Sequence, residues 1–231
     1  MAAVIGVVIP ARNEAQSVGD VVRATAGALP GAYIVVIDDA SADATSTAAR
    51  DAGARVVRLD RHTGYAGALR AGYRAVLDAG ATEIAQIDGD GQHVPQSVVG
   101  LLESLIRYDL VLGSRFLGTG YAMPVGRRIG IAACRTMTRV AGGQRWTDPT
   151  SGFRAMRGTI AEHIADHGFP DELTEGTFLI RLLRQGYSIG EVPVVMNPPR
   201  NGSMHDGVAG LAHLARISRA TLALALDRPR R

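Results

Sequence analysis

The first half of the chain alternates regularly between short apolar segments and longer segments with helical spacing, and this alternation constrains the fold more than any other feature. The apolar segments are rich in valine and isoleucine, which is typical of strands buried on both faces of a parallel sheet. The alternation predicts an α/β fold, a mostly parallel sheet with helices on both faces. We predict strands at Val4–Ile9, Tyr33–Ile37, Arg55–Leu59, Glu83–Ile87 and Leu110–Leu112, and helices at Glu14–Leu29, Ser41–Ala52, Ala66–Ala79 and Pro95–Arg107.

The second half of the chain has a looser pattern. Helical spacing recurs at Val125–Val140 and Glu175–Gln185, and extended segments are predicted at Ser151–Met156 and Ser188–Val192. No stretch rich in proline, serine or glycine marks a linker, and no internal repeat is present. We therefore expect a single domain that spans residues 1–231.

The composition excludes several classes of protein. All 25 basic residues are arginines, so a Schiff-base lysine and the lysine of a Walker phosphate-binding loop are absent. Cys134 is the single cysteine, which excludes an internal disulfide and a zinc site built from cysteines. A net charge of +3 and an aromatic content of 5% do not indicate a nucleic-acid partner. With no signal peptide and no apolar run of about 18 residues, we expect a cytoplasmic protein.

Polar residues follow three of the predicted strands, at Pro10–Glu14, Asp38–Asp39 and Asp88–Gln92. Ligands of doubly wound sheets bind beyond the carboxyl ends of the strands, so we expect these segments to meet at one site. The turn Asp88-Gly89-Asp90-Gly91-Gln92 carries two carboxylates and an amide oxygen, which suit Mg²⁺ or Mn²⁺ together with substrate phosphates. The alternative is that these acids only cap the following helices. Two acidic strand ends in one sheet favour a metal-bound diphosphate.

Six segments carry a resemblance to known enzymes. Val7–Glu14, Ile37–Asp43 and Asp88–Pro95 resemble family 2 glycosyltransferases of the GT-A fold. The later segments Gly113-Ser114-Arg115-Phe116, Thr150-Ser151-Gly152-Phe153-Arg154 and Ile189-Gly190-Glu191-Val192-Pro193 resemble a narrower group, the polyprenyl-phosphate (dolichyl-phosphate) mannosyl- and glucosyltransferases. The resemblance implies a Rossmann-like GT-A sheet. It also implies inverting, metal-dependent transfer of mannose or glucose from GDP-mannose or UDP-glucose to polyprenyl phosphate, with peripheral contact to the inner face of the membrane.

The same resemblance implies roles for individual residues. The residues that would line the nucleotide pocket are Pro10, Ala11, Arg12, Glu14, Ile37 and Asp39. Those that would flank the diphosphate and hold the metal are Asp88, Gly89, Asp90 and Gln92. Arg115 and Arg200 would contact the donor phosphates, and the acceptor phosphate would be met by Arg115, Arg127, Arg128 and Ser203. Guanidinium suits this task because it binds phosphate in a bidentate manner and stays charged.

The need for a general base depends on the acceptor. A lipid phosphate is already an anion and needs no base, whereas a hydroxyl acceptor needs a carboxylate that takes its proton. Asp148 is the best candidate by resemblance, and Glu175 is a rival, although acids are also favoured in a first helical turn by the helix dipole. His205 could reach the metal, and a surface position is its alternative. Two departures from the group are Arg12 in place of tyrosine and Met204 in place of lysine.

Within the single domain, residues 1–113 would bind the nucleotide sugar and residues 114–206 would form the acceptor half. Residues 207–231 would form a helix and tail. Two alternatives to the lipid-phosphate reaction remain: a family 2 glycosyltransferase acting on the hydroxyl of a soluble small molecule, and a non-catalytic subunit that binds a nucleotide sugar. The sequence does not choose between the two donors or between Mg²⁺ and Mn²⁺.

Overall fold

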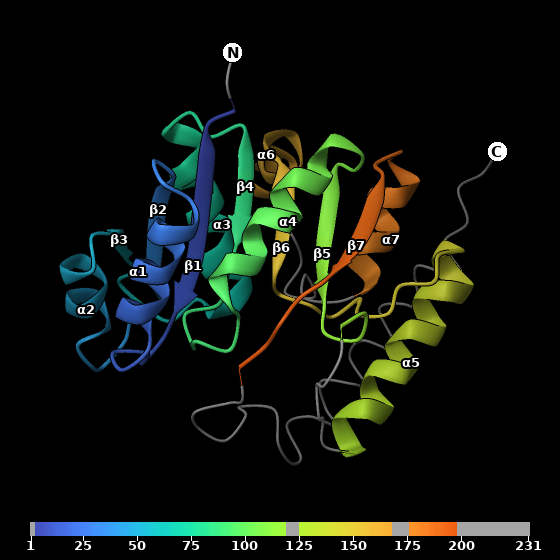
Figure 1. Cartoon of the computed structure of the whole chain (residues 1–231), viewed down its shortest axis with the longest axis horizontal. Coiled ribbons are helices and arrows are strands. Elements are labelled where there is room, and N and C mark those ends of the chain that lie inside the picture. Colours follow the sequence, from blue (N-terminus) through green and yellow to red (C-terminus); the bar gives the residue numbers. More distant parts are fainter. Residues whose placement is uncertain (1–2, 119–124, 168–175, 198–231) are drawn as a thin grey trace.

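A computed structural model describes residues 3–118, 125–167 and 176–197 of the chain. Its centre is a seven-stranded sheet with the strand order β3-β2-β1-β4-β6-β5-β7 (Figure 1). All neighbouring strands are parallel except that β6 runs antiparallel to β4 and β5. The strands are β1 (Ile5–Ala11), β2 (Tyr33–Asp38), β3 (Arg55–Arg58), β4 (Glu83–Gln86), β5 (Leu110–Ser114), β6 (Arg154–Arg157) and β7 (Ile189–Pro193).

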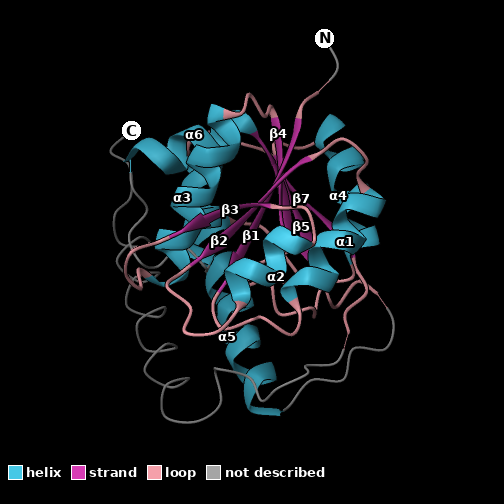
Figure 2. Ribbon diagram, turned by 90° about the vertical axis from the view of Figure 1, so that its left-hand side faces the viewer, coloured by secondary structure: helices cyan, strands magenta, loops and turns pink. Residues whose placement is uncertain are grey.

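Helices cover both faces of the sheet, as Figure 2 shows edge-on. One face carries α1 (Val18–Ala28), α2 (Thr45–Asp51) and α4 (Val98–Glu103), and the other carries α3 (Gly64–Asp78), α6 (Gly158–His167) and α7 (Gly176–Arg184). A further helix, α5 (Val125–Gly142), packs against α7. The predicted α/β fold with a mostly parallel sheet is confirmed.

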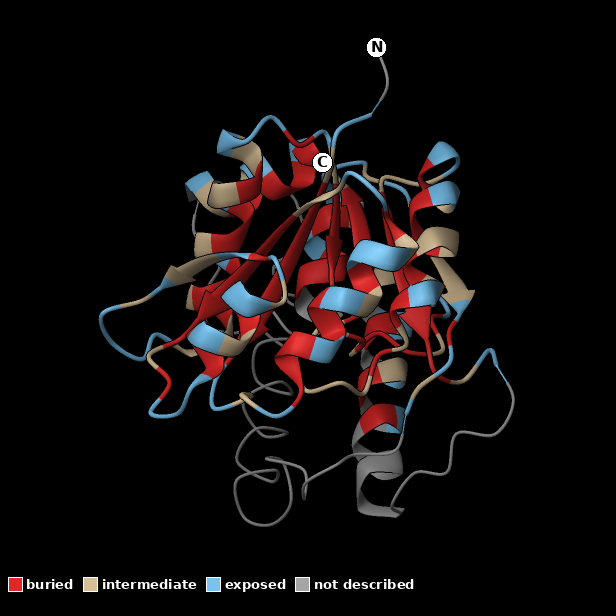
Figure 3. Ribbon diagram, turned by 60° about the vertical axis from the view of Figure 1, so that its left-hand side comes forward, coloured by how far each residue is buried: buried red, intermediate tan, exposed pale blue. Residues whose placement is uncertain are grey.

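Alternate residues of the central strand supply the two cores. Val7 and Ile9 of β1 point into the core under α1 and α4, whereas Val8 points into the core under α3. All three side chains are fully buried, and Figure 3 shows the strands buried while the outer surfaces of the helices are exposed. β1 is therefore apolar on both faces, as expected of a strand at the centre of a parallel sheet.

The observed boundaries differ from the predicted ones where polar loops precede helices. The helix predicted from Glu14 begins at Val18, and the helix predicted from Ser41 begins at Thr45. The extended segment predicted at Ser151–Met156 is the strand Arg154–Arg157, and the helix that follows it, α6, has no counterpart in the sequence prediction. No helix in the described ranges combines the length and the apolar character needed to cross a lipid bilayer.

Candidate active site

The loops that follow β1 and β2 are joined at the carboxyl edge of the sheet. The backbone N–H of Asn13 donates to the Ser41 hydroxyl at 2.9 Å, and the N–H of Glu14 donates to the Thr45 hydroxyl at 2.8 Å. In return, the Ala42 N–H donates to the Asn13 side chain at 2.8 Å. Asn13 has a positive φ of 57°, which asparagine tolerates better than most residues. These reciprocal bonds replace the first helical turns that the sequence pattern predicts here.

Asp38, at the end of β2, stabilises this arrangement. Its side chain is fully buried and accepts hydrogen bonds from the Ser41 N–H at 2.8 Å and from Arg58 at 2.8 Å. The Ser46 hydroxyl also donates to it. Burial by itself raises the pKa of Asp38, but these hydrogen bonds and the charge of Arg58 outweigh it and lower the pKa below its usual value. Asp38 therefore remains an anion inside the fold.

Asp39 holds the start of α3. Its carboxylate accepts hydrogen bonds from the N–H groups of Thr63 at 2.7 Å and Gly64 at 2.9 Å, and it lies 2.7 Å from Nδ1 of His62. The side chain is buried by these partners. Asp39 thus fixes the loop before α3, while the predicted nucleotide contact of this residue stays a prediction. The other residues predicted for the nucleotide pocket end the strands as expected: Pro10, Ala11 and Ile37 are buried, and Arg12 is exposed.

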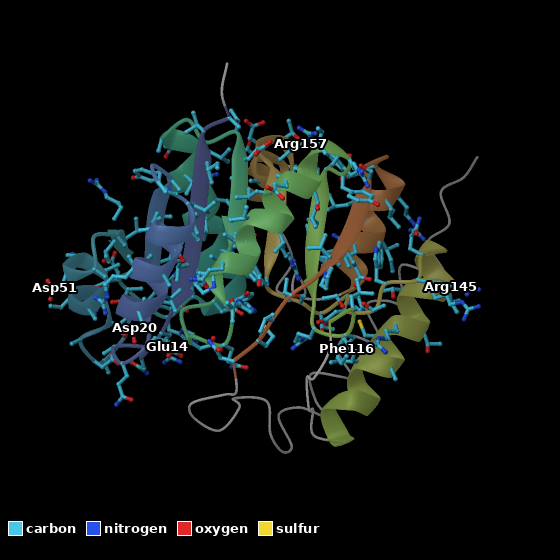
Figure 4. The ribbon with its side chains drawn as sticks, in the orientation of Figure 1. Glu14, Asp20, Asp51, Phe116, Arg145 and Arg157 are labelled. Atoms are coloured by element: carbon cyan, nitrogen blue, oxygen red, sulfur yellow. The ribbon has the colours of Figure 1, made fainter. Side chains whose placement is uncertain are left out.

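Three carboxylates gather at the ends of β1 and β4. The Ser17 hydroxyl lies 2.7 Å from the Glu14 carboxylate and 2.8 Å from the carbonyl oxygen of Gly89, so the two loops meet. Burial raises the pKa of Glu14 and that of Asp90, and the nearby charge of Asp88 raises both further. The site therefore concentrates negative charge that a cation would relieve. Figure 4 shows Glu14 at the carboxyl edge of the sheet, the lower edge in this view, and Arg157 at the opposite edge.

The predicted metal ligands lie together on the turn after β4. Gln92 donates to both oxygens of Asp90, through its backbone N–H at 2.9 Å and through its side-chain amide at 2.6 Å. An added Cβ on Gly89 would lie 3.1 Å from the carbonyl oxygen of Pro10, so this turn approaches β1 too closely for a larger residue to fit easily. Among the described residues, no three acidic, histidine or cysteine side chains converge into a ready metal site. The oxygen groups of Asp88, Asp90 and Gln92 are of the types that Mg²⁺ or Mn²⁺ prefers, so their chemistry fits such an ion.

Arg115 and Asp148 are brought together by the structure, although they were predicted for separate roles. The Arg115 guanidinium binds the carboxylate in a bidentate manner, Nε to Oδ2 at 2.6 Å and Nη2 to Oδ1 at 2.7 Å. The backbone N–H of Arg115 and the Thr150 hydroxyl donate to the same carboxylate, each at 3.2 Å. Asp148 is fully buried and Arg115 is 8% exposed. Each carboxylate oxygen thus accepts two hydrogen bonds.

Glu191 of β7 holds the turn that carries Asp148. The Glu191 carboxylate accepts the N–H of Thr147 at 2.7 Å and the N–H of Asp148 at 2.7 Å. Arg135 of α5 donates to the carbonyl oxygen of Thr147, and its guanidinium lies 4.4 Å from the ring centre of Phe116. Glu191 of β7 and Arg135 of α5 therefore both bind the turn at Thr147 and Asp148, which pairs with Arg115. Figure 4 labels Phe116, which contacts Arg135, at the lower edge of the sheet in that view.

Several predicted residues lie beyond what the structure describes. The backbones of Arg127 and Arg128 belong to α5, but their side chains lie outside the described part. Outside the described residues altogether are Glu175, Arg200, Ser203, Met204 and His205. Their predicted roles stay predictions.

Sequence reasoning missed two residues that surround the acidic turn. Tyr65, at the start of α3, donates a hydrogen bond to Asp88 at 2.7 Å, and the fully buried Gln86 of β4 donates to the Tyr65 hydroxyl at 2.8 Å. The signal that could have found Gln86 is an uncharged polar residue inside an otherwise apolar strand, because a buried amide needs hydrogen-bond partners. Tyr65 carried no such signal, since an aromatic residue at a helix start is ordinary.

Comparisons with known proteins identify the family of this chain. The profile of glycosyl transferase family 2 matches residues 6–164. The undecaprenyl-phosphate mannosyltransferase of Micrococcus luteus is 31% identical over 221 aligned residues, covering 89% of this chain and 89% of that protein. The dolichyl-phosphate hexose transferase of Haloferax volcanii is 31% identical over 219 residues, covering 92% of this chain and 91% of that protein.

A solved structure shares the fold. Glucosyl-3-phosphoglycerate synthase from Mycobacterium tuberculosis, in complex with Mn²⁺, uridine diphosphate and phosphoglyceric acid, matches with a TM-score of 0.73. The match covers 99% of this chain and 80% of that chain at 20% identity. At this identity the likeness supports the shared fold alone.

Proposed function

Because this chain belongs to glycosyl transferase family 2, we propose that it transfers mannose or glucose from a nucleotide sugar to polyprenyl phosphate, with inversion at the anomeric carbon. The donor would be GDP-mannose or UDP-glucose. The relatives from Micrococcus luteus and Haloferax volcanii, named for transfer to undecaprenyl phosphate and dolichyl phosphate, support a lipid-phosphate acceptor. Because such an acceptor is a lipid, the proposal sets the reaction at the cytoplasmic face of a membrane.

The observation that carries the acceptor class is the pairing of Asp148 with Arg115. All the lone-pair positions of the Asp148 carboxylate are used by donors within the fold, and the side chain is fully buried. A carboxylate in this state is poorly suited to take a proton from an acceptor hydroxyl. A phosphate acceptor needs no proton removed, and it does need a cation nearby. We therefore assign Asp148 to the anchoring of Arg115, which contacts a phosphate.

The donor side of the reaction belongs to the acidic turn. Asp90 and Gln92 would hold Mg²⁺ or Mn²⁺, with Asp88 beside them, and the bound ion would offset the negative charge of the departing nucleoside diphosphate. Glu14 supports the turn through Ser17, which lies within hydrogen-bond distance of both Glu14 and Gly89. Residues 1–113 then provide the donor half and the following segment to residue 206 the acceptor half.

The proposal is tested by transfer assays with a panel of radiolabelled nucleotide sugars. Purified protein with Mn²⁺ or Mg²⁺ would receive each donor with polyprenyl phosphate in detergent or, separately, with a soluble cell extract. Metal-dependent label in the organic phase supports the proposal and identifies the donor. Label confined to a water-soluble product would favour a soluble acceptor instead, and no turnover with any donor would favour a non-catalytic binding subunit.

A further inference from the structure

A chain of hydrogen bonds runs from the buried core to the carboxylate of Asp88. The Tyr73 hydroxyl donates to the side-chain oxygen of Gln86, whose amide donates to the Tyr65 hydroxyl at 2.8 Å. Tyr65 in turn donates to Oδ1 of Asp88 at 2.7 Å. A carboxylate only accepts hydrogen bonds, so the Tyr65 hydroxyl is the donor in this contact. Each member of this chain donates toward Asp88.

The backbone around Asp88 is shaped to allow this contact. A Cβ on Gly152 would lie 2.7 Å from the Tyr65 hydroxyl and 2.9 Å from Oδ2 of Asp88, so a larger residue here would force one or both of these side-chain ends to shift. The carbonyl oxygen of Gly152 accepts the second N–H of the Gln86 amide at 2.7 Å. The Asp88 N–H donates to Nδ1 of His93 at 3.1 Å, and the His93 ring stacks on Phe153 with centroids 4.6 Å apart.

Electrostatic repulsion acts against the position of this carboxylate. Asp90 and Glu14 lie close enough to Asp88 for their charges to interact, and like charges repel one another. The Tyr65 hydrogen bond holds the partly exposed Asp88 side chain in place against this repulsion. Within the described residues, the other oxygen, Oδ2, accepts no hydrogen bond, and Nε2 of His93 lies 3.8 Å away from it.

We propose that Tyr65 is a positioning residue, which holds the Asp88 carboxylate in the orientation needed to bind the metal-bound diphosphate of the donor. The hydroxyl fixes one oxygen of Asp88 from the protein side and leaves the other for the ligand edge. The inference rests on the proposed function, because it takes Asp88 as part of the donor site. It also accounts for the glycine in the Thr150–Arg154 segment, since Gly152 makes room for the contact between Tyr65 and Asp88.

Tyr73 provides a matched control. It belongs to the same helix and to the same hydrogen-bond chain, but it donates to Gln86 and not to Asp88. Tyr65→Phe and Tyr73→Phe each remove one hydroxyl from a tyrosine that packs beside the sheet, Tyr73 buried and Tyr65 partly buried. A loss of core stability would therefore affect both variants, whereas a loss of Asp88 orientation would affect Tyr65→Phe alone.

The test measures nucleotide binding by the purified full-length protein with Mn²⁺, by calorimetry, using whichever of GDP and UDP the wild type binds more tightly. We expect Tyr65→Phe to raise the dissociation constant about tenfold, the scale of one hydrogen bond to a charged group. Tyr73→Phe should change it by less than about twofold. Gly152→Ala, which pushes Tyr65 and Asp88 apart from the other side, should weaken binding as Tyr65→Phe does, and it supplies an independent result if Tyr65→Phe does not fold.

The inference is wrong if Tyr65→Phe does not weaken nucleotide binding, or if Tyr65→Phe and Tyr73→Phe weaken it equally. A double-mutant cycle tests the route of the effect. Tyr65→Phe should not weaken nucleotide binding further in an Asp88→Asn background, because the hydroxyl acts through Asp88. Additive effects would contradict that route. If the wild type binds neither nucleotide in the presence of metal, the proposed function is wrong. If the wild type binds a nucleotide and Tyr65→Phe binds it equally well, only the inference about Tyr65 is wrong.

Discussion

Asp148→Asn distinguishes an anchor for Arg115 from a general base. The substitution keeps the size of the side chain but removes the charge that the buried guanidinium faces at 2.6 and 2.7 Å. Breaking one partner of a buried ion pair costs about 3–5 kcal/mol, because the other charge is left without compensation. For a chain of this size, that loss corresponds to a fall in melting temperature of roughly 6–20 °C.

The assay is equilibrium unfolding in guanidinium chloride of Asp148→Asn, Arg115→Met and the double variant. Because the double variant leaves no unpaired buried charge, we expect it to be more stable than Asp148→Asn alone, with a coupling energy of about 1–3 kcal/mol. Asp20→Asn is the control, since Asp20 pairs with Arg23 at 2.7 Å with both side chains more than half exposed. Its variant should lose about 1 kcal/mol or less.

Transfer activity gives the second half of this test. If Asp148 anchors Arg115, Asp148→Asn lowers activity together with stability, and the residual activity keeps the wild-type dependence on pH. An Asp148→Asn variant with wild-type stability and no transfer at any pH would refute the reasoning. That result would return Asp148 to the role of a general base and favour a hydroxyl acceptor.

Three further results follow from the site. Asp90→Asn should weaken Mn²⁺-dependent nucleotide binding at least tenfold, measured by calorimetry with Mn²⁺ and repeated with EDTA, where the variant and the wild type should differ little. The pKa of Glu14 is raised in the fold above its ordinary value of 4.5. Ionisation of Glu14 therefore lowers the free energy of unfolding as pH rises from 4.5 through the folded pKa. Glu14→Gln should raise the melting temperature in EDTA at pH 7 and leave it unchanged at pH 3.5. Glu191→Gln removes one of two acceptors for the N–H groups of Thr147 and Asp148, so it should lower the free energy of unfolding by about 1–3 kcal/mol and reduce transfer, with nucleotide binding retained.

The strands β1 and β2 were predictable from the sequence because each is a short, almost entirely buried run rich in valine and isoleucine. Val4–Ile9 and Tyr33–Ile37 match β1 and β2 to within a residue or two, and their polar ends do meet at one edge. The starts of α1 and α2 were not predictable, because they depend on hydrogen bonds across distant segments. Glu14 reads as a first helical residue, but the Thr45 hydroxyl, 31 residues away, binds its N–H and keeps it in the loop.

The sequence predicted single residues of the candidate site but not the contacts between them. The resemblance pointed to Arg115 and Asp148 separately, and only the fold shows that the two side chains, 33 residues apart, form a bidentate ion pair. Tyr65 was missed for a similar reason, since its partner Asp88 belongs to another strand end. Hydrophobic spacing describes which face of an element is buried, and it does not describe which hydrogen bonds cross between loops.

The most direct test of a phosphate acceptor compares two lipids of the same chain length, polyprenyl phosphate and polyprenol. Both would be offered with the same labelled nucleotide sugar and the same metal ion, and organic-phase label would be measured before and after mild acid. We predict metal-dependent label on polyprenyl phosphate alone, released by mild acid because the product is a glycosyl phosphate. Transfer to polyprenol at a comparable rate, or an acid-stable product, would contradict the account.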